Sequence, residues 1–240
     1  MSNHLGSYLS TLGISLNDVA RRTWLVIPMF NEGPVVRTVV ADALKTFGNV
    51  VCVDDGSSDN SVEEAAAGGA VVVSHPINLG AGAAIRTGLD YALQDPDAEY
   101  FVLFDADGQH QIGDALAMAE RLDTEDLDIL IGSRFLDNRT TPGLVKKIVL
   151  QTAIRFERLS TGVRLTDAHN GLRAMNRRAA SAIEITQNRF AHATEIVAEI
   201  KRHDLAYGEH AVHILYTDYS RSKGQSVWNS VNILSDLFVK

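Results

Sequence analysis

Two carboxylates one residue apart follow a short apolar run in the segment Phe101–His110, which reads FVLFDADGQH. Side chains alternate faces along a strand, so Asp105 and Asp107 can point the same way where the run ends. Two such oxygen ligands suit Mg²⁺ or Mn²⁺, which keep positions open for phosphate oxygens. Asp and Gly are also common turn residues, so the pair taken alone fits a metal site and a solvated turn equally well.

Polar residues also follow other apolar runs of the chain. Five runs are short and nearly continuous, as in strands that are buried on both faces of a parallel sheet. They are Trp24–Met29, Val50–Asp54, Ala70–Ser74, Tyr100–Phe104 and Asp128–Gly132. The polar residues near their ends include Asn31, Glu32, Asp54, Asp55, His75 and Asn78. Ligands of open parallel sheets bind beyond the carboxyl ends of the strands, so we expect these clusters to converge on one crevice.

Helical segments alternate with the apolar runs, near 34–46, 59–67, 82–94 and 113–122. This order predicts an α/β fold, a doubly wound and mostly parallel sheet with helices on both faces. Beyond about residue 143 we expect a helix over 144–160, short helices near 177–184 and 192–203, and one or two strands within 206–217. The expected division is an N-terminal extension over 1–22, a catalytic domain over 23–226 and an amphipathic C-terminal helix over 227–240.

Two glycine-containing turns carry further candidate residues. Asp54 and Asp55 are adjacent and face different directions, so one can accept a hydrogen bond from a nucleobase N–H while the other braces the turn. In Asn78–Gly88, small residues at the head of a helix would let the backbone approach a diphosphate, and Arg86 would add charge. Close packing of the helix on the sheet explains these glycines equally well. The segment is not a dinucleotide fingerprint, because Ile85 stands where the third glycine belongs.

Charge, cysteine content and hydrophobic runs limit the kinds of partner and the cellular compartment that are expected. The net charge of −8 argues against a nucleic-acid binder, and Cys52 is the only cysteine, so an intrachain disulfide is impossible. No run approaches 18 apolar residues and no signal-peptide pattern is present, which favours a cytoplasmic protein. The amphipathic stretches 144–160 and 227–238 suit core packing, or else peripheral contact with the inner face of a membrane or with a membrane partner protein. Four histidines lack metal-ligand spacing and are expected in the core or on the surface: His192, His203, His210 and His213.

Seven motifs, taken in order, resemble those of the inverting GT-A glycosyltransferases of family 2. Five of them are Val26–Gly33, Val53–Asp59, Asn78–Gly82, Asp105–Gln109 and Ile131–Arg134. The later segments Asp167–Arg173 (DAHNGLR) and Arg221–Ser226 (RSKGQS) look like those of the dolichyl-phosphate mannose synthase branch of polyprenyl-phosphate glycosyltransferases. The match runs from about 24 to 228. His169 and Leu172 depart from the branch, which more often has a small polar residue and Phe there.

The resemblance implies a GT-A fold and a set of site residues. The nucleotide sugar would be bound by Pro28, Phe30, Glu32, Asp54, Asp55, Asn78, Gly80, Arg86, Asp105 and Ala106. Mg²⁺ or Mn²⁺ would be held by Asp105, Asp107 and Gln109. The catalytic residues would be Asp107, Arg134, Asp167 and Arg221, and the acceptor phosphate would contact Arg134, Lys146 and Lys147.

The expected reaction is inverting transfer of a sugar from a GDP- or UDP-linked donor to a polyprenyl phosphate, undecaprenyl or dolichyl. A phosphate acceptor is already anionic at neutral pH, whereas a glycan hydroxyl would need a carboxylate base, for which Asp167 is the candidate. Transfer to a glycan hydroxyl in surface polysaccharide synthesis is the alternative.

A sugar-phosphate nucleotidyltransferase would need a Gly-rich basic loop after the first strand, which is absent. The third alternative is a non-catalytic partner of a membrane enzyme, and the intact motifs count against it.

Overall fold

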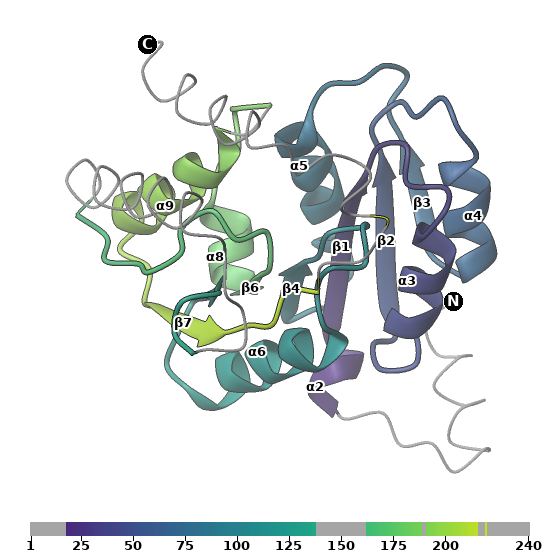
Figure 1. The fold of residues 1–240 in the computed structure, drawn as a ribbon. Coiled ribbons are helices and arrows are strands. Elements are labelled where there is room, and N and C mark those ends of the chain that lie inside the picture. Colours follow the sequence, from purple (N-terminus) through teal and green to yellow (C-terminus); the bar gives the residue numbers. More distant parts are fainter. Residues whose placement is uncertain (1–17, 138–161, 189–190, 216–218, 220–240) are drawn as a thin grey trace.

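The computed structural model describes residues 18–137, 162–188, 191–215 and 219. Within them a seven-stranded sheet runs in the order β3-β2-β1-β4-β6-β5-β7 (Figure 1). The strands are β1 (Thr23–Met29), β2 (Asn49–Asp54), β3 (Val71–Ser74), β4 (Tyr100–Leu103), β5 (Ile129–Ser133), β6 (Arg173–Asn176) and β7 (Tyr207–Ala211). Only β6 runs antiparallel to its neighbours, β4 and β5. The mostly parallel sheet predicted from the sequence is confirmed.

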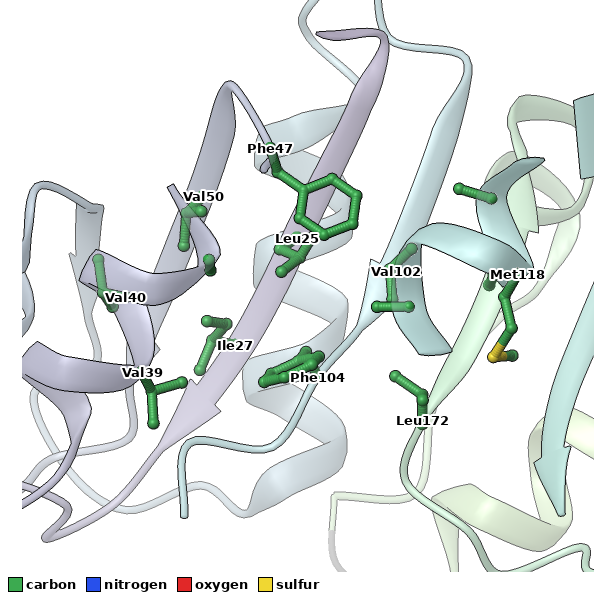
Figure 2. Close-up of a cluster of buried hydrophobic side chains, with 14 of the residues drawn as sticks. Leu25, Ile27, Val39, Val40, Phe47, Val50, Val102, Phe104, Met118 and Leu172 are labelled. Atoms are coloured by element: carbon green, nitrogen blue, oxygen red, sulfur yellow. The ribbon is translucent and has the colours of Figure 1, made fainter. Parts of the chain in front are cut away.

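Helices cover both faces of this sheet. They are α2 (Asp18–Arg21), α3 (Val36–Ala43), α4 (Ser61–Gly68), α5 (Ala81–Ala92), α6 (Ile112–Thr124), α8 (Arg177–Ala182) and α9 (His192–Arg202). Residues of α2, α3, α4 and α6 share a core with Leu25 and Ile27, while those of α5, α8 and α9 share a second core with Trp24 and Val26. Figure 2 shows part of the first core. Alternate residues of β1 thus enter opposite cores, which is why its sequence is apolar almost throughout.

The strand register brings the functional loops to one edge of the sheet. Met29 at the end of β1 lies beside Asp54 at the end of β2. Leu103 at the end of β4 lies beside Arg173, the first residue of β6. Because β6 is antiparallel, the chain that precedes it arrives at the edge where β1, β2 and β4 end. The segment 167–172 is thereby brought next to the loops that follow those strands.

Two features differ from the sequence-based expectation. Strand β6 was not predicted, because its four residues RAMN show neither alternation nor β-branched side chains. Helix α2 lies inside the expected N-terminal extension, yet Val19 and Ala20 are buried in the core, so the packed unit already includes residues 18–22.

The expected helices over 144–160 and 227–238 lie outside the described residues. In the described part of the chain, no helix is long and apolar enough to cross a membrane.

Candidate active site

The loops that follow β1 and β2 hold each other through side-chain-to-backbone hydrogen bonds. Asn31 adopts a left-handed backbone (φ 54°), which Asn tolerates better than most residues. Its Oδ1 accepts from the N–H of Ser58 (2.9 Å), and its own N–H donates to Ser57 Oγ (2.8 Å). The N–H of Glu32 donates to Ser61 Oγ (2.7 Å). Both loops are therefore fixed relative to each other at the carboxyl edge of the sheet.

The adjacent carboxylates after β2 have different surroundings. Asp54 is buried and accepts a hydrogen bond from the N–H of Ser57 (3.2 Å), so it braces the turn. Asp55 accepts from the N–H of Gly80 (2.7 Å) and from His75 Nδ1 (2.8 Å), and it lines a cavity. Of the two carboxylates, Asp55 is thus the one placed to meet a ligand, and its contact with a nucleobase stays a prediction.

That cavity has a volume of about 500 Å³, within the range of small-molecule sites. Its lining includes Pro28, Met29, Phe30, Glu32, Asp55, Asn78, Gly80, Ala81, Ala84, Asp105, Ala106 and Asp107. All the predicted nucleotide-sugar residues except Asp54 and Arg86 are among them. Phe30 is 43% exposed, so its ring offers a flat apolar surface, and Glu32 accepts a hydrogen bond from the hydroxyl of Tyr219 (2.9 Å). We call this the larger cavity.

The prediction that Arg86 adds charge to a phosphate site is not supported. Its Nε donates to Asp90 (2.9 Å) and its Nη1 to the carbonyl oxygen of Ile183 (3.2 Å), because it lies on a face of α5 that does not border the larger cavity. Close packing explains Gly82 of α5, whereas Ala81 and Ala84 of the same helix line the larger cavity, so both interpretations of the small residues stay open. A Cβ on Gly82 would lie 2.1 Å from the carbonyl oxygen of Gln187.

Asp105 lies at the centre of the site. Its side chain is half-exposed to the cavity, and its Oδ2 accepts a hydrogen bond from Nε2 of the buried His110 (2.8 Å). Desolvation by the surrounding protein alone would raise the pKa of Asp105. The charge and hydrogen bond of His110, with smaller contributions from the charges of His192 and Arg173, outweigh this effect and lower the pKa. The imidazole of His110 therefore positions the Asp105 carboxylate.

The charge of Asp107 is less well stabilised than that of Asp105. Desolvation and the neighbouring charge of Asp105 raise its pKa to about 6. Gln109, the third predicted metal ligand, is buried, lines neither cavity described here and donates its backbone N–H to Asp107 (3.0 Å). Within the described residues no group of three or more His, Cys, Asp or Glu side chains forms a metal site. The paired carboxylates nevertheless fit a divalent cation that takes its other ligands from phosphate oxygens and water.

Gly171 leaves the space that Asp105 occupies. A Cβ on this glycine would lie 2.4 Å from Asp105 Oδ2 and 2.8 Å from its Oδ1, so Gly171→Ala must displace the carboxylate. We expect about 10–100-fold weaker binding of Mn²⁺ in the presence of a nucleoside diphosphate, measured by calorimetry. The matched control is Gly113→Ala in α6, whose Cβ would meet nothing within 4 Å. Unchanged Mn²⁺ affinity in Gly171→Ala would contradict this role.

A smaller cavity of about 210 Å³ adjoins the larger one. The two share Pro28, Ala81 and Asp105. The rest of the lining comes from Ile85, Leu103, Phe104, His169, Asn170, Gly171, Arg173, His192 and Ala193. His192, which was expected in the core or on the surface, is partly buried at the start of α9 and lines this cavity. Its position depends on packing between elements distant in the sequence, so no local signal marks it.

Arg134 and Asp167 form a tight buried pair. Arg134 donates from Nε to Asp167 Oδ2 (2.6 Å) and from Nη2 to Oδ1 (2.7 Å), while its backbone N–H also reaches Oδ2 (3.1 Å). The Asp167 side chain is fully buried and that of Arg134 is 12% exposed. Glu209 of β7 holds the N–H of Asp167 (3.2 Å). With both of its oxygens bound by Arg134, Asp167 is placed as a positioning residue, and the expectation that it acts as a base loses support.

Three predicted residues, Lys146, Lys147 and Arg221, lie outside the described residues. Their roles stay predictions. Among the described residues, the sequence singled out neither Asn170 nor Arg173 for a role of its own, although both belong to the motif Asp167–Arg173. The motif itself was the sequence signal that could have marked them as site residues. It lies beside Asp105 because β6, which follows it, runs antiparallel to β4.

Comparisons with known proteins show the family to which the chain is similar. A model of the family described as glycosyl transferase family 2 matches residues 24–183. An uncharacterized protein of Methanocaldococcus jannaschii is 33% identical, with 94% of this chain and 95% of that protein covered. The UDP-N-acetylglucosamine–dolichyl-phosphate N-acetylglucosaminyltransferase of Methanococcus voltae is 28% identical over 85% of this chain and 90% of its own.

More distant similarities extend to solved structures. The dodecaprenyl-phosphate galacturonate synthase of Rhizobium johnstonii is 32% identical over 60% of this chain and 44% of its own. The glucosyl-3-phosphoglycerate synthase of Mycobacterium tuberculosis, solved with Mn²⁺, UDP and phosphoglyceric acid, superposes with a TM-score of 0.64 at 16% identity. That superposition covers 98% of this chain and 82% of the other. The similarity shows a shared GT-A fold.

Proposed function

The chain belongs to glycosyltransferase family 2, and on that basis we propose that it transfers a sugar, with inversion, from a UDP-linked donor to a polyprenyl phosphate. The observation that carries the proposal is the pair Asp105 and Asp107 in a cavity that Phe30 and Asp55 also line. Phe30 suits stacking against a nucleobase, and the Asp55 carboxylate suits acceptance of a base N–H. The two acidic residues after β4 then face the diphosphate.

A divalent metal fits this diphosphate position. Asp105 and Asp107 would hold Mg²⁺ or Mn²⁺, which relieves the repulsion that raises the pKa of Asp107 to about 6. When bound, the metal would stabilise the negative charge of the departing nucleoside diphosphate. His110 keeps Asp105 oriented, and the N–H of Gln109 does the same for Asp107. Arg221, outside the described residues, remains the proposed second contact of the diphosphate.

The acceptor is proposed from chemistry and from relatives. A phosphate monoester is largely ionised at neutral pH, so it attacks without a protein base. Asp167, the carboxylate considered for that base, is bound through both oxygens to Arg134. Two relatives are named as acting with dolichyl phosphate or dodecaprenyl phosphate, and the relative named for dolichyl phosphate uses a UDP-linked sugar. These points support a polyprenyl phosphate over a glycan hydroxyl, and UDP over GDP.

Lipid acceptors imply contact with a bilayer. The amphipathic stretches 144–160 and 227–238 remain the proposed contact, through the membrane surface or a membrane partner protein, together with Lys146 and Lys147. Both stretches lie outside the described residues. This part of the proposal rests on sequence pattern.

The test is a comparison of matched acceptors. The protein is incubated with UDP-sugars and Mn²⁺ and with undecaprenyl phosphate, dolichyl phosphate, the corresponding polyprenols or a soluble oligosaccharide. We expect sugar to enter the organic phase only with the lipid phosphates, since the polyprenols lack the anionic nucleophile. Transfer to the oligosaccharide in preference to the lipid phosphates would favour the glycan alternative.

A further inference from the structure

We propose that His75, held in place by Thr87, is a positioning residue that presents the Asp55 carboxylate to the nucleobase as a single hydrogen-bond acceptor. The inference rests on the proposed function in one respect, namely that the larger cavity binds a nucleoside diphosphate. It goes further by naming the residue behind Asp55 and the class of base that this arrangement selects. That class carries a ring N–H, as uracil and guanine do, in place of the ring acceptor of cytosine and adenine.

Strand register places His75 beside Asp55. Asp54 at the end of β2 pairs with Ser74 at the end of β3. The backbone N–H of His75 donates to the carbonyl oxygen of Asp54 (2.8 Å), so the pairing continues one residue beyond β3. The imidazole Nδ1 then lies 2.8 Å from Asp55 Oδ1. Because an ionised carboxylate only accepts hydrogen bonds, Nδ1 is the donor in this contact.

Thr87 fixes the other side of the imidazole. Its Oγ1 lies 2.9 Å from His75 Nε2, and it belongs to α5, which packs on β1 and β2 in the second core. The His75 side chain is only 10% exposed. With both ring nitrogens bonded and the ring largely buried, the folded protein sets the orientation of the imidazole before a ligand binds.

Asp55 is left with one position for a ligand hydrogen. Its Oδ1 accepts from His75 and from the N–H of Leu79 (2.9 Å), and its Oδ2 accepts from the N–H of Gly80 (2.7 Å). A carboxylate has about four lone-pair positions, so these three donors of the described residues leave one, on Oδ2. Asp55 lines the larger cavity, whereas neither His75 nor Thr87 does. His75 therefore acts on a ligand through Asp55.

A single acceptor on Oδ2 discriminates between bases. Uracil N3 and guanine N1 carry a hydrogen that this oxygen can accept, whereas cytosine N3 and adenine N1 would face the carboxylate with a lone pair. Such a mismatch leaves polar groups of both partners unpaired, which is how a site rejects the wrong ligand. Loss of the His75 bond would free Asp55 Oδ1, so the carboxylate would no longer be held with Oδ2 toward the base.

Two variants and a control separate positioning from local structure. His75→Leu removes both side-chain hydrogen bonds, whereas His75→Asn keeps a donor, because its amide nitrogen is as many bonds from Cα as Nδ1 is. His203→Leu is the matched control. The Nε2 of His203 contacts Glu199 (3.1 Å) at the end of α9, and neither residue lines a cavity described here. The melting temperature of each variant without ligand checks that the fold is retained.

Calorimetry with Mn²⁺ would compare UDP, GDP, CDP and pyrophosphate, which lacks a base. We expect the wild type to bind UDP or GDP at least about tenfold more tightly than CDP. His75→Leu should bind the preferred nucleotide about tenfold more weakly, the effect of one hydrogen bond, with pyrophosphate unchanged. His75→Asn should recover most of this loss, and His203→Leu should bind all four ligands as the wild type does.

Three results would overturn the inference: an equal loss of pyrophosphate binding in His75→Leu, no loss of the preferred nucleotide, or no recovery in His75→Asn. Failure of the proposed function looks different. Preference for GDP would contradict the UDP-linked donor, and a bound donor that is never transferred to a lipid phosphate would contradict the reaction; both leave the role of His75 standing. A wild type that binds no nucleoside diphosphate overturns both proposals.

Discussion

Asp107→Asn is expected to remove transfer activity and at the same time to stabilise the metal-free protein at neutral pH. Loss of one of the two carboxylates that would hold the metal should lower turnover by at least about 10²–10³-fold, as for other electrostatic groups that act on the leaving charge. The fold should tolerate the change, because Asp107 lies in an open cavity and is only partly buried.

The stability gain follows from the raised pKa. Desolvation and Asp105 raise the pKa of Asp107 from 3.8 to about 6, so the folded protein binds this proton more tightly than the unfolded chain does. The free energy of unfolding of the wild type therefore falls as the pH rises from about 4 to about 6, and the full penalty remains at higher pH. Asparagine carries no charge and lacks the penalty. Thermal unfolding with a chelator should show a higher melting temperature for Asp107→Asn at about pH 8 and no difference at about pH 4.

The control for this experiment is Asp126→Asn, which changes an exposed carboxylate in the loop after the C-terminus of α6. It should alter neither turnover nor the pH dependence of melting. Saturating Mn²⁺ should reverse the order of the two melting temperatures at about pH 8, since only the wild type keeps both carboxylates for the cation. A variant that retains activity, or that is less stable than the wild type at about pH 8, would contradict the assignment.

Arg134→Ala should be among the most destabilising substitutions near the site. It leaves the fully buried Asp167 carboxylate without its partner, and removing one member of a buried pair costs about 3–5 kcal/mol. Arg134→Lys should cost less, because it keeps the charge and loses the two-pronged geometry. Urea unfolding measures both.

An exposed ion pair provides the comparison. Lys45 bonds Asp42 (2.6 Å) with both side chains more than half exposed, so Lys45→Ala should change the free energy of unfolding by at most about 1 kcal/mol. The double variant Arg134→Ala with Asp167→Ala should recover part of the loss, because no uncompensated charge remains. A cost for Arg134→Ala no larger than that for Lys45→Ala would show that the pair does not stabilise the fold.

Prediction from sequence succeeded where signals are local. The apolar runs before Asn31, Asp54 and Asp105 became strands β1, β2 and β4, because uninterrupted runs of this kind are stable only when both faces are covered. The same patterns placed the polar residues at one edge. The roles of Asp54 and Arg86 could not be read in this way, since they depend on the groups that each side chain meets after folding.

The sequence by itself determined the fold class, the parallel part of the sheet and the acidic pair Asp105 and Asp107, because these follow from periodicity and from alternation along single segments. Only the tertiary structure decided which residues surround that pair. His110 is turned onto Asp105, Arg134 is paired with Asp167, and Asn170 reaches the smaller cavity through the antiparallel entry of β6. The physical reason is that these contacts join segments whose order in space is set by strand pairing and packing, which no local pattern encodes.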